Sequence, residues 1–392
     1  MTNQNSTQKS RQLSAWEKNL LGVPLQDTPK LIPGMIVISI LAWFCIWLSE
    51  FIGVTLLGFD KSPISPVMLA ILFGLIISAV VPLPASLKPG LSFAVRKVLR
   101  LGIILLGIRL TIFDVFRLGL SGIPIVVICI IGALIITTQV NKWLRLPQRL
   151  GALIAVGTSI CGVSAIVATS PAIDAEEEET AYAVAVITIF GLLATLIYPY
   201  AANVIFSGNA SQVGLWLGTS IHDTSQVIGA AKVYADVFSQ PLALDVATVT
   251  KLVRNVFMAL VIPFMAYYYA RSMKEEGVSK NKVTNPFKLL PLFILGFLAM
   301  AVIRSIGDAG LQTSGEAFGL WDAETWNGMI KFITTWAGNF LVVALAGVGL
   351  STKTSTFRGL GLKPFIVGLS AALAVGLVSF LTILVVGGLV TL

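Results

Sequence analysis

The chain has 392 residues, of which 56% are hydrophobic and 12% charged, and its formal net charge is +8. A soluble domain carries about a quarter charged residues. The composition therefore excludes a soluble globular protein and indicates an all-α polytopic membrane protein. The sequence has no Walker A, G-x-S-x-G or H-E-x-x-H motif and no basic helix with interleaved aromatic residues. We therefore expect no enzyme, no ATP-driven pump, no metal, no cofactor and no nucleic-acid partner.

The first thirty residues are polar, with Lys9, Arg11, Lys18 and Lys30 among them. This pattern lacks the layout of a cleavable signal peptide. We expect a cytoplasmic segment over 1–30 and a transmembrane domain over 31–392.

Apolar runs of the length needed to cross a bilayer, roughly 20 residues, recur along the whole chain. They predict about eleven spans, at 31–53, 64–82, 96–115, 121–140, 150–172, 180–205, 212–234, 246–270, 287–305, 329–350 and 363–388.

Charges in the predicted loops alternate in sign. Basic residues gather in 142–149, 271–288 and 353–363, whereas 174–179 and 308–324 are acidic. By the positive-inside rule the basic loops are cytoplasmic. This predicts a cytoplasmic N-terminus and, with an odd number of spans, a C-terminus on the outside.

One polar motif occurs twice within these apolar runs. Gly157-Thr158-Ser159-Ile160 and Gly218-Thr219-Ser220-Ile221 each share a serine four positions further on, giving G-T-S-I-x-x-x-S. Glycine and clustered hydroxyls weaken a helix. A broken helix at membrane depth is tolerated only where protein or a water-filled cavity provides hydrogen-bond partners for its free backbone groups. Paired broken segments indicate the binding site of a secondary transporter.

A second self-similarity has a different offset. Gly107-x-x-Leu110, Gly119-Leu120 and Pro124 recur 240 positions later as Gly347-x-x-Leu350, Gly359-Leu360 and Pro364. In the predicted topology these copies cross the membrane in opposite directions, as an inverted repeat requires. The boundaries of that repeat stay open.

If both motif segments break, each second half-helix begins at mid-membrane with unpaired N–H groups and a partial positive charge. Two such ends facing one cavity form an anion cradle. The alternative is that the hydroxyls only bond the preceding helical turn or join neighbouring helices. The candidate binding residues in these segments are Thr158, Ser159, Cys161, Gly162, Ser164, Thr219, Ser220, His222, Asp223, Thr224, Ser225 and Gln226.

His222 is the only histidine in the chain and stands beside Asp223. Histidine changes charge near physiological pH, so these two residues are candidates for proton coupling. Asp223 also suits the N-cap of a half-helix, and His222 could equally well bridge two helices.

Three further cations lie in predicted spans. Lys251 and Arg254 share one helix face, and we expect them to balance the charge of a bound anion. The alternative is that they extend to the interface. Arg109 is ambiguous in the same way.

Several motifs resemble the YeiH family of bacterial inner-membrane proteins, which are described as sulfate exporters. They are GTSICGVSAIVA, GLWLGTSIHDTSQVIGAA, KLVRN, SPVMLAILFG and LLGIRL, and the likeness covers nearly all the chain after about residue 30. The resemblance implies the inner membrane. It also implies a relation to the cation–proton antiporter and anion transporter superfamily, with a core of crossing broken helices that moves against a scaffold domain.

The expected function is secondary transport, in the export direction, of a small oxyanion such as sulfate by alternating access. The expected partners are this anion, the lipid bilayer and a coupling ion, either proton or sodium, and a homodimer stays open. The alternatives are a cation–proton antiporter with Asp223 as the cation carboxylate, and a membrane sensor or scaffold that transports nothing.

Overall fold

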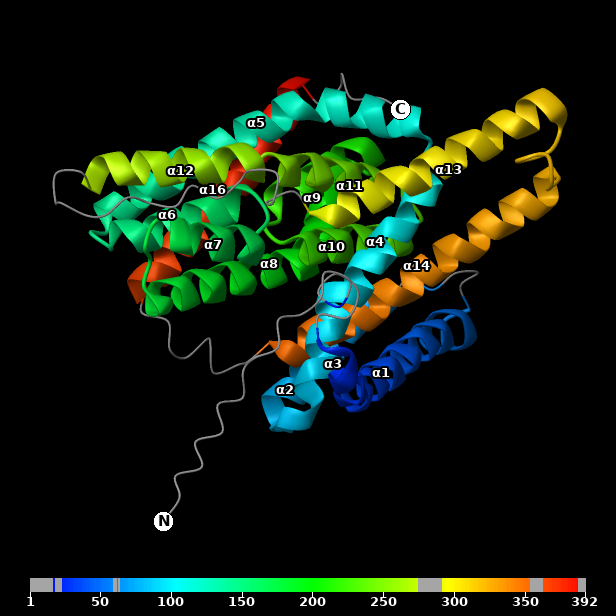
Figure 1. Cartoon of the computed structure of the whole chain (residues 1–392), viewed down its shortest axis with the longest axis horizontal. Coiled ribbons are helices and arrows are strands. Elements are labelled where there is room, and N and C mark those ends of the chain that lie inside the picture. The colour runs from blue at the N-terminus through cyan, green and yellow to red at the C-terminus, as the bar shows by residue number, and fades with distance from the viewer. Residues whose placement is uncertain are drawn as a thin grey trace, which may run out of the picture.

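A computed structural model of the protein describes residues 17, 23–58, 62, 64–273, 291–352 and 362–386. Over these residues the chain is helical, with an isolated backbone bridge between Ala317 and Trp321 (Figure 1). The helices are α1 (Ile32–Glu50), α2 (Pro66–Val80), α3 (Lys88–Phe93), α4 (Leu99–Leu106), α5 (Ile112–Trp143), α6 (Gln148–Ser159), α7 (Val163–Thr169), α8 (Glu177–Ile205), α9 (Ala210–Ser220), α10 (Thr224–Val237), α11 (Pro241–Val256), α12 (Met258–Met273), α13 (Leu292–Ser314), α14 (Ala323–Ser351) and α16 (Leu362–Val386). Short 3-10 or π turns extend some of them, at Leu25–Leu31, Phe51–Leu56, Ala85–Leu87, Ala94–Val98, Gly107–Arg109 and Ser170–Ala172.

Within these residues, 7 helical stretches are long and apolar enough to cross a membrane, which confirms an all-α polytopic membrane protein. They are Leu25–Leu56, Ile112–Trp143, Glu177–Ile205, Pro241–Tyr269, Leu292–Ser314, Ala323–Ser351 and Lys363–Val386. The other predicted spans correspond to shorter or more polar helices. Most of the predicted N-terminal segment 1–30, and most of the basic loops 271–288 and 353–363, lie outside the described residues.

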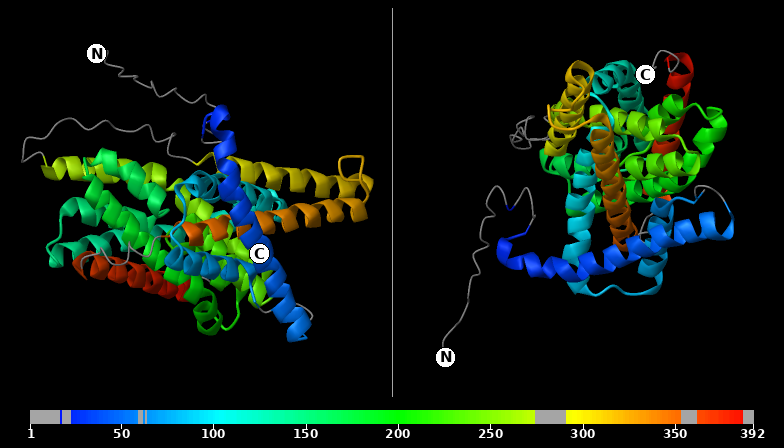
Figure 2. Two further views of the ribbon diagram at one scale, coloured as in Figure 1. Left: turned by 90° about the horizontal axis from the view of Figure 1, so that it is seen from below. Right: turned by 90° about the vertical axis from the view of Figure 1, so that its right-hand side faces the viewer.

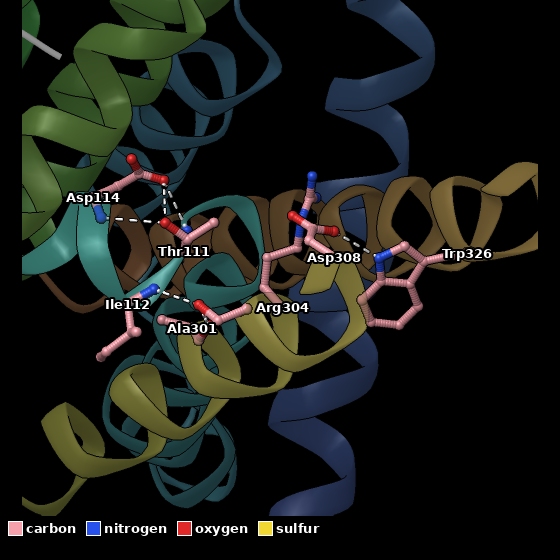
Figure 3. A network of polar contacts seen from close by, with 8 residues as sticks. Thr111, Ile112, Asp114, Ala301, Arg304, Asp308 and Trp326 are labelled. Atoms are coloured by element: carbon pink, nitrogen blue, oxygen red, sulfur yellow. Dashed lines mark hydrogen bonds and ion pairs between the residues drawn. The ribbon is translucent and has the colours of Figure 1, made fainter. Parts of the chain in front are cut away.

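The predicted boundary between the third and fourth spans is wrong. The chain turns at Leu110 and Thr111, and α5 begins at Ile112 rather than near residue 121. Thr111 caps α5 through a capping box with Asp114, and the N–H of Ile112 donates to Ser305 Oγ at 2.8 Å (Figure 3). A capped N-terminus fixes where a helix starts, and this signal lay within the predicted span.

The helices form two groups. The scaffold helices are α1–α4 with α13 and α14, and the core helices are α5–α12 with α16. Helix α14 packs along α2, α4 and α1, while α11 packs along α9, α10 and α5. In Figure 1 the scaffold helices α1–α3 lie below the core helices, and Figure 2 shows α13 and α14 running side by side beyond the rest of the molecule.

The breaks predicted at both polar motifs are confirmed. Helix α6 ends at Ser159 and α7 begins at Val163, while α9 ends at Ser220 and α10 begins at Thr224. The three residues between the arms, 160–162 and 221–223, are called the tips below.

Each broken segment turns back instead of continuing across. In the second, Trp216 of α9 stacks on Tyr198 of α8 at 4.5 Å, and α10 runs alongside α8 with Gln226 bonded to Thr188 and Tyr234 bonded to Asn203. The start of α9 and the end of α10 therefore both lie near the end of α8.

In the first broken segment, Gly157 of α6 lies against Ile166 of α7, so its two arms are also side by side. Figure 1 shows α6 and α7 toward one end of the core and α9 and α10 toward the other. The predicted crossings 150–172 and 212–234 are thus two re-entrant hairpins that enter from opposite ends and meet at their tips. The acidic loop 174–179 consequently lies at the same end as Lys142 and Arg145, not opposite them as predicted.

The predicted inverted repeat agrees with the helix directions. Gly102 of α4 lies near Leu341 of α14, whereas Gly347 of α14 lies near Val95, so the two segments are antiparallel. Each is followed by a core helix, α5 or α16, and these two pack together.

Gly162 makes the turn in the first hairpin. Its φ is 67° and its ψ −127°, a combination essentially restricted to glycine. A Cβ there would lie 3.1 Å from the Cα of Asp223 in the other tip. Glycine therefore allows both the reversal of the chain and the contact between the hairpins.

We expect Gly162→Ala to lower the free energy of unfolding by about 1–3 kcal/mol because of backbone strain, with a further loss from the clash. Thermal unfolding of purified protein measures this. The matched control is Gly315→Ala, since Gly315 has φ 75° but nothing within 4 Å of an added Cβ. Equal losses in the two variants would show that the contact between tips adds nothing to stability.

Candidate functional site

The two tips bring the duplicated motifs together at the centre of the core helices. Helices α6 and α9 end there, so their last carbonyl groups have no partner within the helix. Gly157 and Gly218 lie inside these helices, not at the breaks, and allow close packing against Ile166 and Thr250 respectively. The first glycine of each motif thus serves packing, and the break follows three residues later.

Arg254 binds the carbonyl groups of both hairpins. Its Nε donates to Ser159 O at 2.7 Å, and its Nη1 donates to Thr219 O at 2.7 Å and to Ile221 O at 3.1 Å. Nη2 donates to Thr158 O. Four of the five guanidinium N–H donors are therefore bound to backbone, and the side chain is fully buried.

Lys251, one turn earlier on α11, is also fully buried and bonded to both tips. Its Nζ donates to Ile160 O at 2.8 Å, to Ile221 O at 3.1 Å and to His222 O. The alternative that these two cations extend to the interface is wrong. They lie where predicted, but they hold the C-terminal ends of α6 and α9, whose dipoles are negative.

Three hydroxyl groups of the motifs bond to carbonyl groups of their own helix. Ser159 donates to Val156 O, Thr219 to Leu215 O and Ser220 to Trp216 O. Thr219 also pairs with Ser379 of α16 at 2.5 Å, a partner that nothing in the sequence indicated. For these three residues the contacts seen are those of the structural alternative.

The start of α10 is capped by its own side chains. Asp223 Oδ1 accepts from the N–H of Ser225 at 2.8 Å and from its hydroxyl at 2.6 Å, and Gln226 completes a capping box. The predicted N-cap role of Asp223 is thus confirmed. A carboxylate already stands at this helix end, which weakens the predicted cradle there, whereas α7 begins without a side-chain cap.

The remaining predicted residues differ in placement. Cys161 is buried with its sulfur 3.4 Å from that of Met258, and Ser164 is exposed. Thr224 accepts a hydrogen bond from Asn255, which follows Arg254 on α11. Asn255 was not among the predicted site residues, although its position beside Arg254 was a signal.

Three buried polar atoms at the tips have no hydrogen-bond partner among the described residues. They are Thr158 Oγ1, His222 Nδ1 and Asn255 Oδ1. A buried polar atom without a partner costs about 1–3 kcal/mol, so such a group calls for a ligand or water. These atoms come from α6, the second tip and α11, and His222 is 2% exposed.

Positive charge exceeds negative charge at the tips. Within the described residues neither Lys251 nor Arg254 forms an ion pair, and Asp223 is the one carboxylate of the two tips. Arg109 does not add to this excess, because it forms a two-point ion pair with Asp245 at 2.6 and 2.9 Å. In the described part of the chain no cluster of His, Cys, Asp or Glu is suited to hold a metal ion.

We expect Arg254→Ala to lower the free energy of unfolding by about 3–5 kcal/mol, as removal of one partner of a buried charged network does. Arg254→Lys should recover only a minor part of the lost stability, because a single ammonium group cannot reach the four carbonyls that the planar guanidinium group reaches. Thermal unfolding measures both. The control is Arg117→Ala, because Arg117 is an exposed arginine on α5. An Arg254→Ala variant as stable as that control would contradict the role of Arg254 in joining the two hairpins.

Comparison with known proteins identifies the family. Residues 33–368 match the family described as Conserved hypothetical protein 698. The chain is 33% identical over 341 residues to a UPF0324 membrane protein of Corynebacterium glutamicum, which covers 86% of this chain and 87% of that protein. A UPF0324 membrane protein of Streptococcus agalactiae is 32% identical over 349 residues, covering 89% of this chain and 95% of that protein. The chain therefore belongs to the UPF0324 family of membrane proteins, and the YeiH resemblance of its motifs is confirmed.

Proposed function

We propose that the protein is a secondary transporter that binds a small oxyanion, such as sulfate or a related sulfur anion, where the two hairpin tips meet. The observation that carries this proposal is the excess of buried positive charge there. Lys251 and Arg254 are both fully buried, and one carboxylate, that of Asp223, stands against them.

An uncompensated charge at membrane depth is expensive, by about 2.5–3.5 kcal/mol or more. The backbone carbonyls solvate the two cations but carry no net charge. A bound anion would complete the neutralisation. Thr158 and His222 hold buried polar atoms without partners, and they supply hydrogen-bonding groups at the same place.

The paired hairpins also suit alternating access. Because α6–α7 and α9–α10 enter the core from opposite ends, the tips lie where a path opened from either end would lead. Core helices that shift against the scaffold helices would open one path and then the other. We propose that the protein lies in the bacterial inner membrane, with its N-terminus in the cytoplasm and its C-terminus outside. It would move the anion out of the cell and would catalyse no chemical reaction.

A cation–proton antiporter with Asp223 as the cation ligand is the less favoured alternative. A cation bound at Asp223 would stand beside the fixed charges of Lys251 and Arg254. In a sensor or scaffold that transports nothing, Lys251 and Arg254 would only join the two tips, and their excess of positive charge would have no ligand.

The first test is ligand stabilisation of the purified protein. A ligand that binds only the folded state raises its stability, by about 2.7 kcal/mol at a hundred times the dissociation constant. We expect sulfate, sulfite, thiosulfate or a sulfonate such as taurine or sulfoacetate to raise the unfolding midpoint, and sodium and lithium chlorides to leave it unchanged. Flux of the stabilising anion into proteoliposomes then separates a transporter from a sensor. Stabilisation by sodium or lithium alone would favour the antiporter.

We further propose that His222 couples anion binding to protons. Protonation of His222 puts a third positive charge beside Lys251 and Arg254, and a bound anion favours this protonation. By linkage, the anion must then bind more tightly at lower pH. Since His222 is the only histidine, His222→Gln should flatten the dependence of anion affinity between about pH 5 and 8. A variant that keeps the full wild-type dependence would assign coupling to Asp223 or to no protein group.

A further inference from the structure

The ammonium group of Lys251 occupies a cage of backbone oxygens. Ile160 O comes from the first tip, and Ile221 O and His222 O come from the second. These are three acceptors for the three N–H donors of a lysine. The group is fully buried and, within the described residues, has no carboxylate partner.

Such a cage is also a site for a monovalent cation. Unwound carbonyls and the C-terminal ends of half-helices bind sodium in transporters with broken helices, and carbonyl oxygens replace the hydration shell of potassium in channels. Here three carbonyls from two separate hairpins converge on one point, and a side chain from a third element, α11, fills it.

We propose that Lys251 acts as a tethered cation in a monovalent-cation site, so that the wild-type protein needs no alkali-metal ion to join its two hairpin tips. Removal of the side chain opens this site to a free cation. One consequence, that sodium is not the coupling ion, rests on the proposed function of a transporter. The cage itself is a property of the fold and is tested without transport.

The distances decide which free cation fits. Nζ lies 2.8 Å from Ile160 O, 3.1 Å from Ile221 O and 2.5 Å from His222 O. The two longer separations are those of N–H···O hydrogen bonds, so ammonium and methylammonium, which donate the same bonds, are the cations expected to replace the lysine group. Arg254 has no equivalent, because its planar fork spreads over four carbonyls instead of filling one cage.

The test is thermal unfolding of Lys251→Ala in chloride salts of ammonium, methylammonium, potassium, sodium and choline at equal ionic strength. Alanine leaves the cage empty, so its midpoint in choline should fall below that of the wild type. Ammonium or methylammonium should restore at least about half of the lost midpoint in a saturable way, as a bound ligand does. The wild type should show the same midpoint in all five salts.

Lys251→Met is the matched control, since methionine fills much of the space of the lysine stem but brings no charge. It should lose stability and gain nothing from ammonium. If folded Lys251→Ala can be purified in ammonium chloride but not in choline chloride, the yield of folded protein itself shows the rescue by ammonium. Removal of ammonium should then unfold the variant.

Several outcomes overturn the proposal. The first is a Lys251→Ala unfolding midpoint as high in choline as in ammonium, and the second is a Lys251→Met midpoint that ammonium raises. The third is a wild-type midpoint that an alkali cation raises. The fourth is a Lys251→Ala variant whose midpoint no salt restores or that does not fold even in ammonium. None of these depends on anion binding. Failure of oxyanions to stabilise the wild type would contradict the proposed function and leave the cation cage standing.

Discussion

The structure depends on how two helix ends are satisfied where no water reaches. Helices α6 and α9 stop in the centre of the core helices, and their last carbonyls would otherwise be buried without partners, at a cost of several kcal/mol each in an apolar medium. Lys251 and Arg254 donate to six carbonyls of the helix ends and tips, those of residues 158–160, 219, 221 and 222. Because each cation contacts both hairpins, α11 holds the two tips as one unit.

That solution creates the feature from which function is inferred. Cations satisfy the carbonyl dipoles, but they leave net positive charge in the core beside Asp223. The tips thus combine backbone carbonyls bound by two cations with a net positive charge, and this charge is the basis of the proposal that an anion binds there. If the scaffold and core helices moved against each other, α11 would carry both tips and their charges together, so the proposed anion site would keep its geometry.

Several of these features were predictable from residue patterns. The two G-T-S-I copies located both breaks, and Asp223 followed by Ser225 and Gln226 indicated the new helix start. The reversal of each hairpin was not predictable, because a break of three residues fits a straight or a reversed path equally well and Gly162 fixes the choice only through its positive φ. The partners of Arg254 and Lys251 were also hidden, since backbone carbonyls bear no sequence signature. Ser379 comes from a helix 160 positions away from Thr219.

The most direct test of the account is an experimental structure of the protein with selenate, an oxyanion whose selenium gives an anomalous signal. We expect one buried anomalous peak at the hairpin tips, within hydrogen-bonding distance of the Thr158 hydroxyl or the His222 ring and close to Lys251 and Arg254. Occupied tips would show that the buried charge excess is a binding site. Tips that stay empty while selenate lies elsewhere, such as at the exposed Arg96 and Arg100, would contradict it.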